Sequence, residues 1–351
     1  MRRVSKIATA GIATAALAFT ATACGGTSSD AAGSKGDGKG KGVAIAYDVG
    51  GKGDQSFNDA ATAGMDKAAK DLKIGKKAVE PTDGESDADK VQRLTELAKQ
   101  GYNPVIGVGY AYAPAVKEVA EKFPKVTFGI VDDATIKADN VSDLVFNEEQ
   151  SSYLAGVAAA KATKSKTVGF IGGVNNPLIR KFEAGFVQGV QDTDKSVKIK
   201  RQFLTEKAED GGFSSPDKGK EGASGQIEDG ADVVYHAAGL SGQGVIEQAA
   251  AEKVWAIGVD SDQYKQKALE KYKKYILTSA TKDVAGAVYN LTKSVQDGNA
   301  KGGVVRADLA SGGVALADSN PEFTKMKDLQ AALKKAEQGI TSGKIKVKTT
   351  L

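Results

Sequence analysis

Acidic residues stand at the ends of three apolar runs, where their side chains could accept hydrogen bonds from a small molecule. Asp48, Asp132 and Asp260 each close or directly follow such a run. If the runs are strands of parallel sheets, the carboxylates lie beyond the carboxyl ends of strands, which is where ligands bind in open α/β sheets. A carboxylate accepts hydrogen bonds from hydroxyl and amine groups. The pattern therefore predicts a site for a small molecule rich in such donors.

Aromatic, amide and basic residues near other expected strand ends extend this inventory. A lysine donates to oxygen acceptors, and a pair of phenylalanines can sandwich a flat ring. A purine nucleoside offers a flat base, hydroxyl donors and oxygen acceptors. Each acid alone could instead cap a helix, and each phenylalanine could belong to a core, but their joint occurrence at strand ends favours a binding site. The further candidate site residues are Phe57, Asn58, Tyr110, Phe213, Gly239 and Lys282.

The stretch from Asp48 to Ala60 combines an acid, a glycine turn and a helix start. It follows the apolar run 43–47 and leads into a helical pattern that begins near Ser56. Glycines allow a ligand to approach closely, and the first turn of a helix has backbone N–H groups without helical partners. We therefore expect this stretch to form one edge of the site, with free N–H groups facing the ligand.

Catalytic and cofactor motifs are weak in this sequence. The single histidine, His236, lies inside the expected strand 232–236, and we expect it to be structural rather than a general base. The glycine-rich stretch 239–244 has the order G-x-x-G-x-G, reversed from the dinucleotide fingerprint. The stretch 172–176 lacks the lysine and hydroxyl residue of a P-loop. We therefore expect no cofactor, no metal site and no enzymatic activity.

The first residues predict an extracytoplasmic address. A basic start is followed by the apolar, alanine-rich run 7–19 and by small residues before Cys24, the only cysteine. This order predicts a signal peptide over 1–23 and a lipid attached to Cys24, as in a bacterial lipobox. The alternative is an ordinary signal peptide with a cysteine nearby by chance. Residues 24–42, rich in Gly, Ser, Ala and Lys, are expected to form a flexible tether.

The bulk charge gives no support for nucleic acid binding. The formal net charge is +4, and removal of Arg2, Arg3 and Lys6 with the signal leaves +1. The remaining chain of about 310 residues exceeds the usual single-core limit of about 250–300 residues, so two lobes are expected.

Short apolar runs alternate with amphipathic stretches from Gly42 onward, which predicts parallel sheets with helices on both faces. The second series repeats the architecture of the first, so we predict two doubly wound parallel-sheet lobes. The chain is expected to cross between them near Asn147, Thr281 and Gly302, with the ligand cleft between the lobes. The predicted lobes are 43–147 with 281–302, and 148–280 with 303–351.

A series of short motifs resembles the basic membrane protein (Bmp) family, lipoprotein substrate-binding components of ABC transporters for purine nucleosides. The stretch D-V-G-G-K-G-D-Q-S-F-N over 48–58 resembles the family's opening motif D-x-G-x-x-D-x-S-F-N. The resemblance extends from about Val43 to Asn290. The other matching motifs are SYLAG at 152–156, VGFIGG at 168–173, AAGLSGQGV at 237–245, IGVDSDQ at 257–263 and LTSATK at 277–282.

The resemblance implies a type I periplasmic-binding fold with a ligand clamped between the lobes. On the side of the base, it implies that Asp48 and Asn58 face the ring. It also implies that Phe57 and Phe213 stack on the two faces of the ring. Tyr110 stands where the family often has phenylalanine after a glycine.

The ribose side follows from the same resemblance. Asp260 is implied to accept hydrogen bonds from the ribose hydroxyls, aided by Gly239 and Lys282. Asp132 ends the strand below Tyr110 and is expected to lie close by.

The resemblance therefore implies a lipid-anchored binding protein that delivers a purine nucleoside to the permease of an ABC importer. Its expected location is the extracytoplasmic face of the cell membrane, and the chain is expected to act as a monomer. One alternative keeps the same fold and binds a sugar, since sugar sites also combine aromatic rings with acids. A more remote alternative is a nucleoside hydrolase or phosphorylase.

Overall fold

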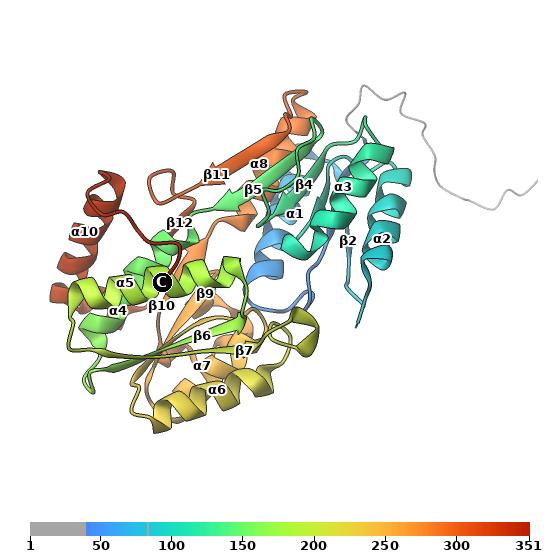
Figure 1. The fold of residues 1–351 in the computed structure, drawn as a ribbon. Helices are drawn as coiled ribbons and strands as arrows, with labels where there is room; N and C mark the ends of the chain where they lie inside the picture. Colours follow the sequence, from blue (N-terminus) through green and yellow to red (C-terminus); the bar gives the residue numbers. More distant parts are fainter. Residues whose placement is uncertain (1–39, 83) are drawn as a thin grey trace, which may run out of the picture. The chain divides into compact units, whose positions relative to one another are not determined.

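The computed structural model describes residues 40–82 and 84–351, and their strands form two six-stranded sheets (Figure 1). The first sheet has the order β11-β5-β4-β3-β1-β2 and is parallel throughout. Its strands are β1 (Gly42–Ala46), β2 (Gly75–Val79), β3 (Val105–Gly107), β4 (Phe128–Val131), β5 (Val141–Phe146) and β11 (Gly303–Ala307).

Helices cover both faces of the first sheet. Alternate residues of β1 point to opposite faces. Val43 and Ile45 pack with α1 (Phe57–Leu72) and α8 (Val284–Gln296). Ala44 and Ala46 pack on the other face, which is covered by α2 (Asp87–Lys99) and α3 (Ala113–Lys122). The expected double winding is present in this lobe.

The second sheet has the order β12-β10-β9-β8-β6-β7, in which only the short β12 runs antiparallel to its neighbour. One face packs against α4 (Glu148–Ala162), α5 (Pro177–Thr193) and α10 (Lys327–Thr341), and the other against α6 (Pro216–Glu228) and α7 (Ser241–Ala251). The short helix α9 (Pro321–Lys325) precedes α10. The strands are β6 (Thr167–Val174), β7 (Lys198–Thr205), β8 (Val233–Ala237), β9 (Trp255–Asp260), β10 (Ile276–Lys282) and β12 (Val314–Leu316). The predicted fold class, two doubly wound lobes, is confirmed.

Close packing of α4 against α5 depends on glycines. A Cβ at Gly156, Gly185 or Gly189 would lie 2.0–2.2 Å from a carbonyl oxygen of the facing helix. Any larger residue would therefore push the two helices apart. Because α5 also supplies side chains to the cavity described below, this packing helps to fix the cavity wall.

The chain crosses between the sheets after β5, after β10 and after β11. The third crossing differs from the expectation near Gly302. Strand β11 pairs in parallel with β5, with Ala307 opposite Phe146, so residues 303–307 belong to the first lobe rather than the second. The residues of β11 would suit either sheet, and only its pairing with β5 decides the assignment.

The predicted signal peptide and Cys24 lie outside the described residues. The predicted tether overlaps the described part of the chain only at residues 40–42, and β1 already begins at Gly42. Within 40–82 and 84–351, no helix combines the length and apolar character needed to cross a bilayer.

Candidate functional site

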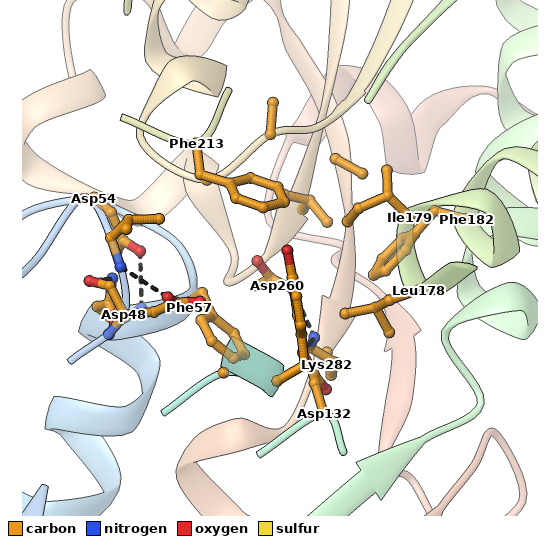
Figure 2. A pocket seen from close by; sticks show the side chains of 18 residues that line it. Asp48, Asp54, Phe57, Asp132, Leu178, Ile179, Phe182, Phe213, Asp260 and Lys282 are labelled. Carbon is orange, nitrogen blue, oxygen red and sulfur yellow. Dashed lines mark hydrogen bonds and ion pairs between the residues drawn. The ribbon is translucent and has the colours of Figure 1, made fainter. Parts of the chain in front are cut away.

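The carboxyl ends of the parallel strands of both lobes meet at one cavity of about 520 Å³, part of it continuous with solvent. Figure 2 shows Asp48 and Asp54 at one end of the cavity and Leu178, Ile179 and Phe182 of α5 at the other. All nine residues proposed from the sequence line the cavity: Asp48, Phe57, Asn58, Tyr110, Asp132, Phe213, Gly239, Asp260 and Lys282.

Asp48 follows β1 and is held in place by Asn58. The backbone N–H of Asp48 donates to Oδ1 of Asn58 at 3.0 Å, and Oδ1 of Asp48 accepts from the Val49 N–H at 2.8 Å. Gly109 leaves room for the carboxylate, because a Cβ there would lie 2.2 Å from Oδ2 of Asp48. Burial raises the pKa of Asp48 to about 7, so this carboxyl changes charge near neutral pH.

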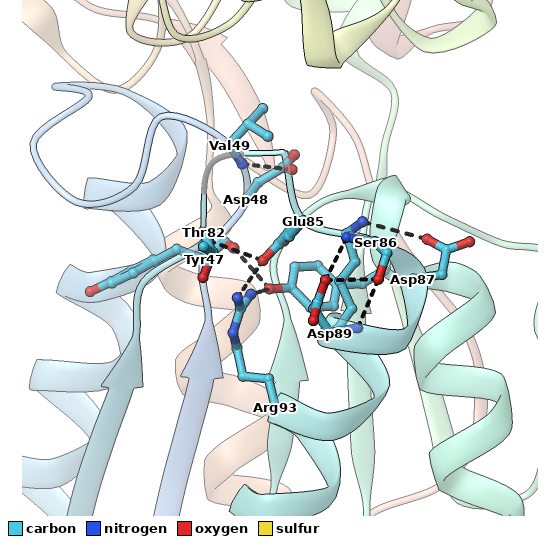
Figure 3. Close-up of polar contacts among 11 residues, drawn as sticks. Tyr47, Asp48, Val49, Thr82, Glu85, Ser86, Asp87, Asp89 and Arg93 are labelled. Atoms are coloured by element: carbon cyan, nitrogen blue, oxygen red, sulfur yellow. Dashed lines mark hydrogen bonds and ion pairs between the residues drawn. The ribbon is translucent and has the colours of Figure 1, made fainter.

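A buried polar chain supports Asp48 from behind (Figure 3). The hydroxyl of Tyr112 donates to the backbone carbonyl of Tyr47 at 3.0 Å, and Nη1 of Arg93 donates to that hydroxyl at 2.6 Å. Arg93 also forms an ion pair with Glu85. The peptide unit before Asp48 is thereby fixed from α2 and from the start of α3, which sequence reasoning did not predict.

Asp54 is a cavity residue that sequence reasoning did not single out. Its carboxylate accepts from the backbone N–H groups of Ser56 at 2.9 Å, Asn58 at 2.8 Å and Asp59 at 3.1 Å. The expectation that N–H groups at the start of α1 are free for a ligand is therefore wrong for these three groups. Burial raises the pKa of Asp54 to about 6. An acid just before a helical pattern is a capping signal, and it could have indicated this role.

Lys282, the last residue of β10, forms the charged centre of the cavity. Its Nζ lies 2.6 Å from Oδ2 of Asp132 and 3.5 Å from Oδ1 of Asp260, and the three side chains are only 3%, 4% and 8% exposed. Burial alone would lower the pKa of Lys282, but the neighbouring carboxylates outweigh it and raise that pKa. Burial raises the pKa of Asp132 to about 6, against the opposing attraction of Lys282.

Asp132 and Asp260 share an unusual backbone conformation. Their φ angles are +67° and +59°, in the left-handed region that aspartate tolerates better than most residues. This conformation places both side chains beside Lys282 at the strand ends. Oδ2 of Asp260 also accepts from the hydroxyl of Ser56 at 2.7 Å. Oδ1 of each acid is buried and accepts no hydrogen bond from the described residues.

Two phenylalanines reach the cavity from different lobes, Phe57 from the start of α1 and Phe213 from the loop between β7 and α6 (Figure 2). The ring centroid of Phe57 lies 4.6 Å from Nζ of Lys282, within range of a cation–π contact. The ring of Phe213 rests against β6, because a Cβ at Gly173 would lie only 2.5 Å from its Cδ1. The cavity therefore has an aromatic face on each lobe.

Tyr110 and Gly239 occupy the loops after β3 and β8. The hydroxyl of Tyr110 accepts from Nδ2 of Asn176 at 3.1 Å, so its polar end is engaged by the opposite lobe. Gly239 has φ +52°, and its backbone lies beside Phe213.

His236 does not line the cavity. It is fully buried in β8, and its Nε2 lies 3.0 Å from Oε1 of Gln263. Burial lowers the pKa of His236 to about 4, as expected for a structural histidine that stays neutral. Within the described part of the chain, no group of three or more His, Cys, Asp or Glu residues is arranged to hold a metal ion.

The apolar wall of the cavity was not predicted from the sequence. Leu178, Ile179 and Phe182 project from the first turns of α5, directly after β6. Their spacing is that of a helix with one buried stripe, which also fits ordinary core packing. The rule that ligands bind beyond strand ends, applied to β6, would have indicated Leu178 and Ile179.

Comparison with known proteins places the chain in a family. Residues 41–350 match the family model Bmp, described as ABC transporter substrate-binding protein PnrA-like. The chain is 36% identical to the ABC transporter nucleoside-binding protein BmpA of Lactococcus lactis, over 95% of this chain and 96% of that protein. It is 33% identical to an uncharacterized lipoprotein of Pyrococcus horikoshii, over 82% of this chain and 73% of that protein.

The fold also agrees with a solved structure. The crystal structure of an ABC transporter solute-binding protein from Aeropyrum pernix superposes with a TM-score of 0.75 at 28% identity, covering 88% of this chain and 93% of that one. The family model spans both lobes and every residue of the cavity. The chain therefore belongs to the Bmp family of ABC transporter substrate-binding proteins.

Proposed function

We propose that the substrate is a purine nucleoside, bound in the cavity between the two lobes and delivered to the permease of an ABC importer. The observation that carries this proposal is the combination of an aromatic ring from each lobe with two buried carboxylate oxygens, Oδ1 of Asp132 and of Asp260, that accept no hydrogen bond from the described residues. Among these residues, only a longer ion-pair contact, 3.5 Å from Nζ of Lys282, reaches Oδ1 of Asp260. A flat base suits the rings and ribose hydroxyls suit the carboxylates. The name of the Lactococcus lactis relative supports a nucleoside.

The base is proposed to bind between Phe57 and Phe213. Asp48 then accepts a hydrogen bond from an N–H group of the base, while Asn58 and the chain through Tyr112 hold Asp48 in position. Stacking alone would accept any flat ring, so the hydrogen bond to Asp48 supplies the choice of base.

The ribose is proposed to bind at the charged centre. Its hydroxyls donate to Oδ1 of Asp260 and of Asp132 and accept from Nζ of Lys282, with Gly239 leaving space for the sugar. Buried acceptors that lose their donor are costly, so an analogue without these hydroxyls should bind much more weakly.

Calorimetry on ligand-stripped protein tests the proposal, with adenosine, guanosine, inosine and uridine, and with ribose, arabinose and galactose as competitors. We expect one purine nucleoside per chain and no displacement by the sugars. Displacement by a pentose or hexose would support the sugar alternative, and no heat with any purine nucleoside would rule out the proposed substrate. Incubation with inosine and an assay for hypoxanthine would reveal a hydrolase or phosphorylase.

Nucleoside affinity should depend on pH through Asp48. The ionised carboxylate accepts hydrogen bonds more strongly than the protonated acid, and its pKa is about 7, so affinity should fall by up to about tenfold from pH 8 to pH 6. Titrations across this range measure the effect. The Asp48→Asn variant is the control, because Asp54 and Asp132, each with a pKa of about 6, remain in it. An equally steep profile in Asp48→Asn would exclude this role for Asp48.

We also propose that the mature chain is anchored by a lipid on Cys24 at the extracytoplasmic face of the cell membrane. The basic start, the apolar run and the cysteine after small residues support this. The relative in Pyrococcus horikoshii is named a lipoprotein. The Cys24→Ala chain should no longer fractionate with membranes, and retention of that variant in the membrane fraction would contradict the anchor.

A further inference from the structure

A hydrogen bond between Tyr110 and Asn176 joins the two lobes across the cavity. Nδ2 of Asn176, on the second lobe, donates to the hydroxyl of Tyr110, on the first lobe, at 3.1 Å. Tyr110 follows β3 and lines the cavity, whereas Asn176 follows β6 and precedes α5. The polar end of Tyr110 is therefore engaged by protein rather than directed at a ligand.

The strand order places this contact away from the crossings of the chain. In the first sheet, β4 separates β3 from β5, and in the second sheet β8 and β9 separate β6 from β10. The crossings follow β5, β10 and β11, along one edge of each sheet. The contact between Tyr110 and Asn176 therefore lies toward the outer part of the cleft, where hinge motion between the lobes would be largest.

Other polar contacts between the lobes lie elsewhere. Lys282 reaches Asp132 beside a crossing. The loop 53–56 of the first lobe is bound by Gln243, Asp260, Ser261 and Gln263, which belong to α7 and to the segment at and after β9. None of these contacts involves β6 or α5. The bond to Tyr110 is thus an independent tie between the first lobe and α5.

Asn176 also holds the start of α5. Its Oδ1 accepts from the Ile179 N–H at 2.9 Å, which is an N-cap, while its Nδ2 reaches Tyr110. Because Leu178, Ile179 and Phe182 of α5 form the apolar wall of the cavity, one side chain links that wall to the opposite lobe.

We propose that Tyr110 and Asn176 form a latch that holds the lobes closed over the ligand and sets how long the ligand stays bound. Asn176 is a positioning residue in this scheme, and the hydroxyl of Tyr110 acts on the opposite lobe. The kinetic arm of the test rests on the proposed nucleoside function, and a second arm does not.

The kinetic arm compares Tyr110→Phe, Asn176→Ser and the double variant by dilution of complexes with tritiated adenosine and inosine. Serine retains a capping oxygen but is too short to reach Tyr110. We expect each single change to raise the dissociation rate about 2- to 12-fold, the range for one hydrogen bond, with a much smaller change in the association rate. The double variant should resemble the single variants, because both remove the same bond.

The kinetic measurement has a control variant, and two of its outcomes would contradict the latch. Tyr102→Phe removes a tyrosine hydroxyl outside the cavity and should leave the dissociation rate unchanged. A direct contact between the Tyr110 hydroxyl and the ligand would instead give additive effects of the two single variants. An unchanged dissociation rate in Tyr110→Phe, or such additivity, would overturn the latch.

The second arm measures the distance between the lobes without relying on a nucleoside. Spin labels on Lys117→Cys in α3 and Glu221→Cys in α6, in the chain with Cys24→Ser, report the distance by pulsed electron resonance. We expect Tyr110→Phe to shift the distribution toward longer distances, both without ligand and with adenosine. If wild-type protein binds no nucleoside, the proposed function fails, and this arm still decides the latch. An identical distribution in Tyr110→Phe would overturn it.

Discussion

Asp260→Asn is expected to weaken purine nucleoside binding by roughly 30-fold or more, the effect of removing one partner from a buried charged hydrogen bond. Asparagine keeps the size of the side chain and tolerates the φ of +59° at this position, so the fold should be retained. Alanine at the same position would add backbone strain, which makes Asp260→Asn the cleaner change. Calorimetry measures the loss of affinity, and circular dichroism checks the fold.

A surface aspartate supplies the control for this prediction. Among the residues that the structure describes, Asp229 in the same lobe forms an ion pair with Lys200, and its side chain is 60% exposed. Asp229→Asn should leave nucleoside affinity unchanged. An affinity equal to wild type in Asp260→Asn would remove Asp260 from the binding site.

Lys282→Met is expected to lower the free energy of unfolding by about 3–5 kcal/mol at pH 7.5, the usual cost of leaving buried charges without their partner. Lys282 is the cation within 3.5 Å of Asp132 and Asp260, and methionine conserves its length without its charge. Urea unfolding followed by the fluorescence of Trp255, the single tryptophan, measures the loss.

The loss should shrink as the pH falls. The folded-state pKa of Asp132 is already raised to about 6, and removing Lys282 should raise it further. A carboxyl group whose pKa is higher in the folded than in the unfolded protein stabilises the fold fully at a pH below its unfolded-state pKa. This stabilisation is lost as the pH rises through its folded-state pKa. The loss in Lys282→Met should therefore shrink as the pH falls toward 6, the folded-state pKa of Asp132 in wild type, and should stay small between pH 6 and pH 4.

The matched control is Lys200→Met, in which the lost ion pair with Asp229 is exposed. Its effect on unfolding should be much smaller and should depend little on pH over the same range. A loss in Lys282→Met that is as large at pH 4 as at pH 7.5 would contradict the assignment of a buried charge cluster.

The sheets were predictable from the sequence where their strands are buried. Strands such as β1, β6 and β9 are continuous apolar runs, because parallel strands are covered on both faces. Strand β2 was not predicted, because it lies at the edge of its sheet and its sequence GKKAV is not an apolar run: it includes two lysines, and Lys76 is exposed. The sheet to which β11 belongs depends on pairing with β5, which local sequence does not encode.

Residues of the cavity could be predicted from the sequence where they lie at the ends of strands. Asp48 and Asp132 could be assigned to one site because the ends of the parallel strands of the first sheet meet at one edge, and Asp260 ends β9 of the second sheet, on the other side of the expected cleft. The contribution of α5 to the cavity could not be predicted, because Phe182 stands at a helical spacing that suits a hydrophobic core equally well. The capping role of Asp54 and the bond between Tyr110 and Asn176 depend on side-chain geometry across turns and lobes.

Native mass spectrometry of the chain purified without denaturant tests the central claim most directly. We expect a one-to-one complex whose added mass is that of a purine nucleoside, either as purified or after incubation with a nucleoside mixture. The same added mass should be much reduced in Asp260→Asn. An added mass matching a sugar, or wild-type protein that retains no purine nucleoside after incubation, would contradict the proposed substrate.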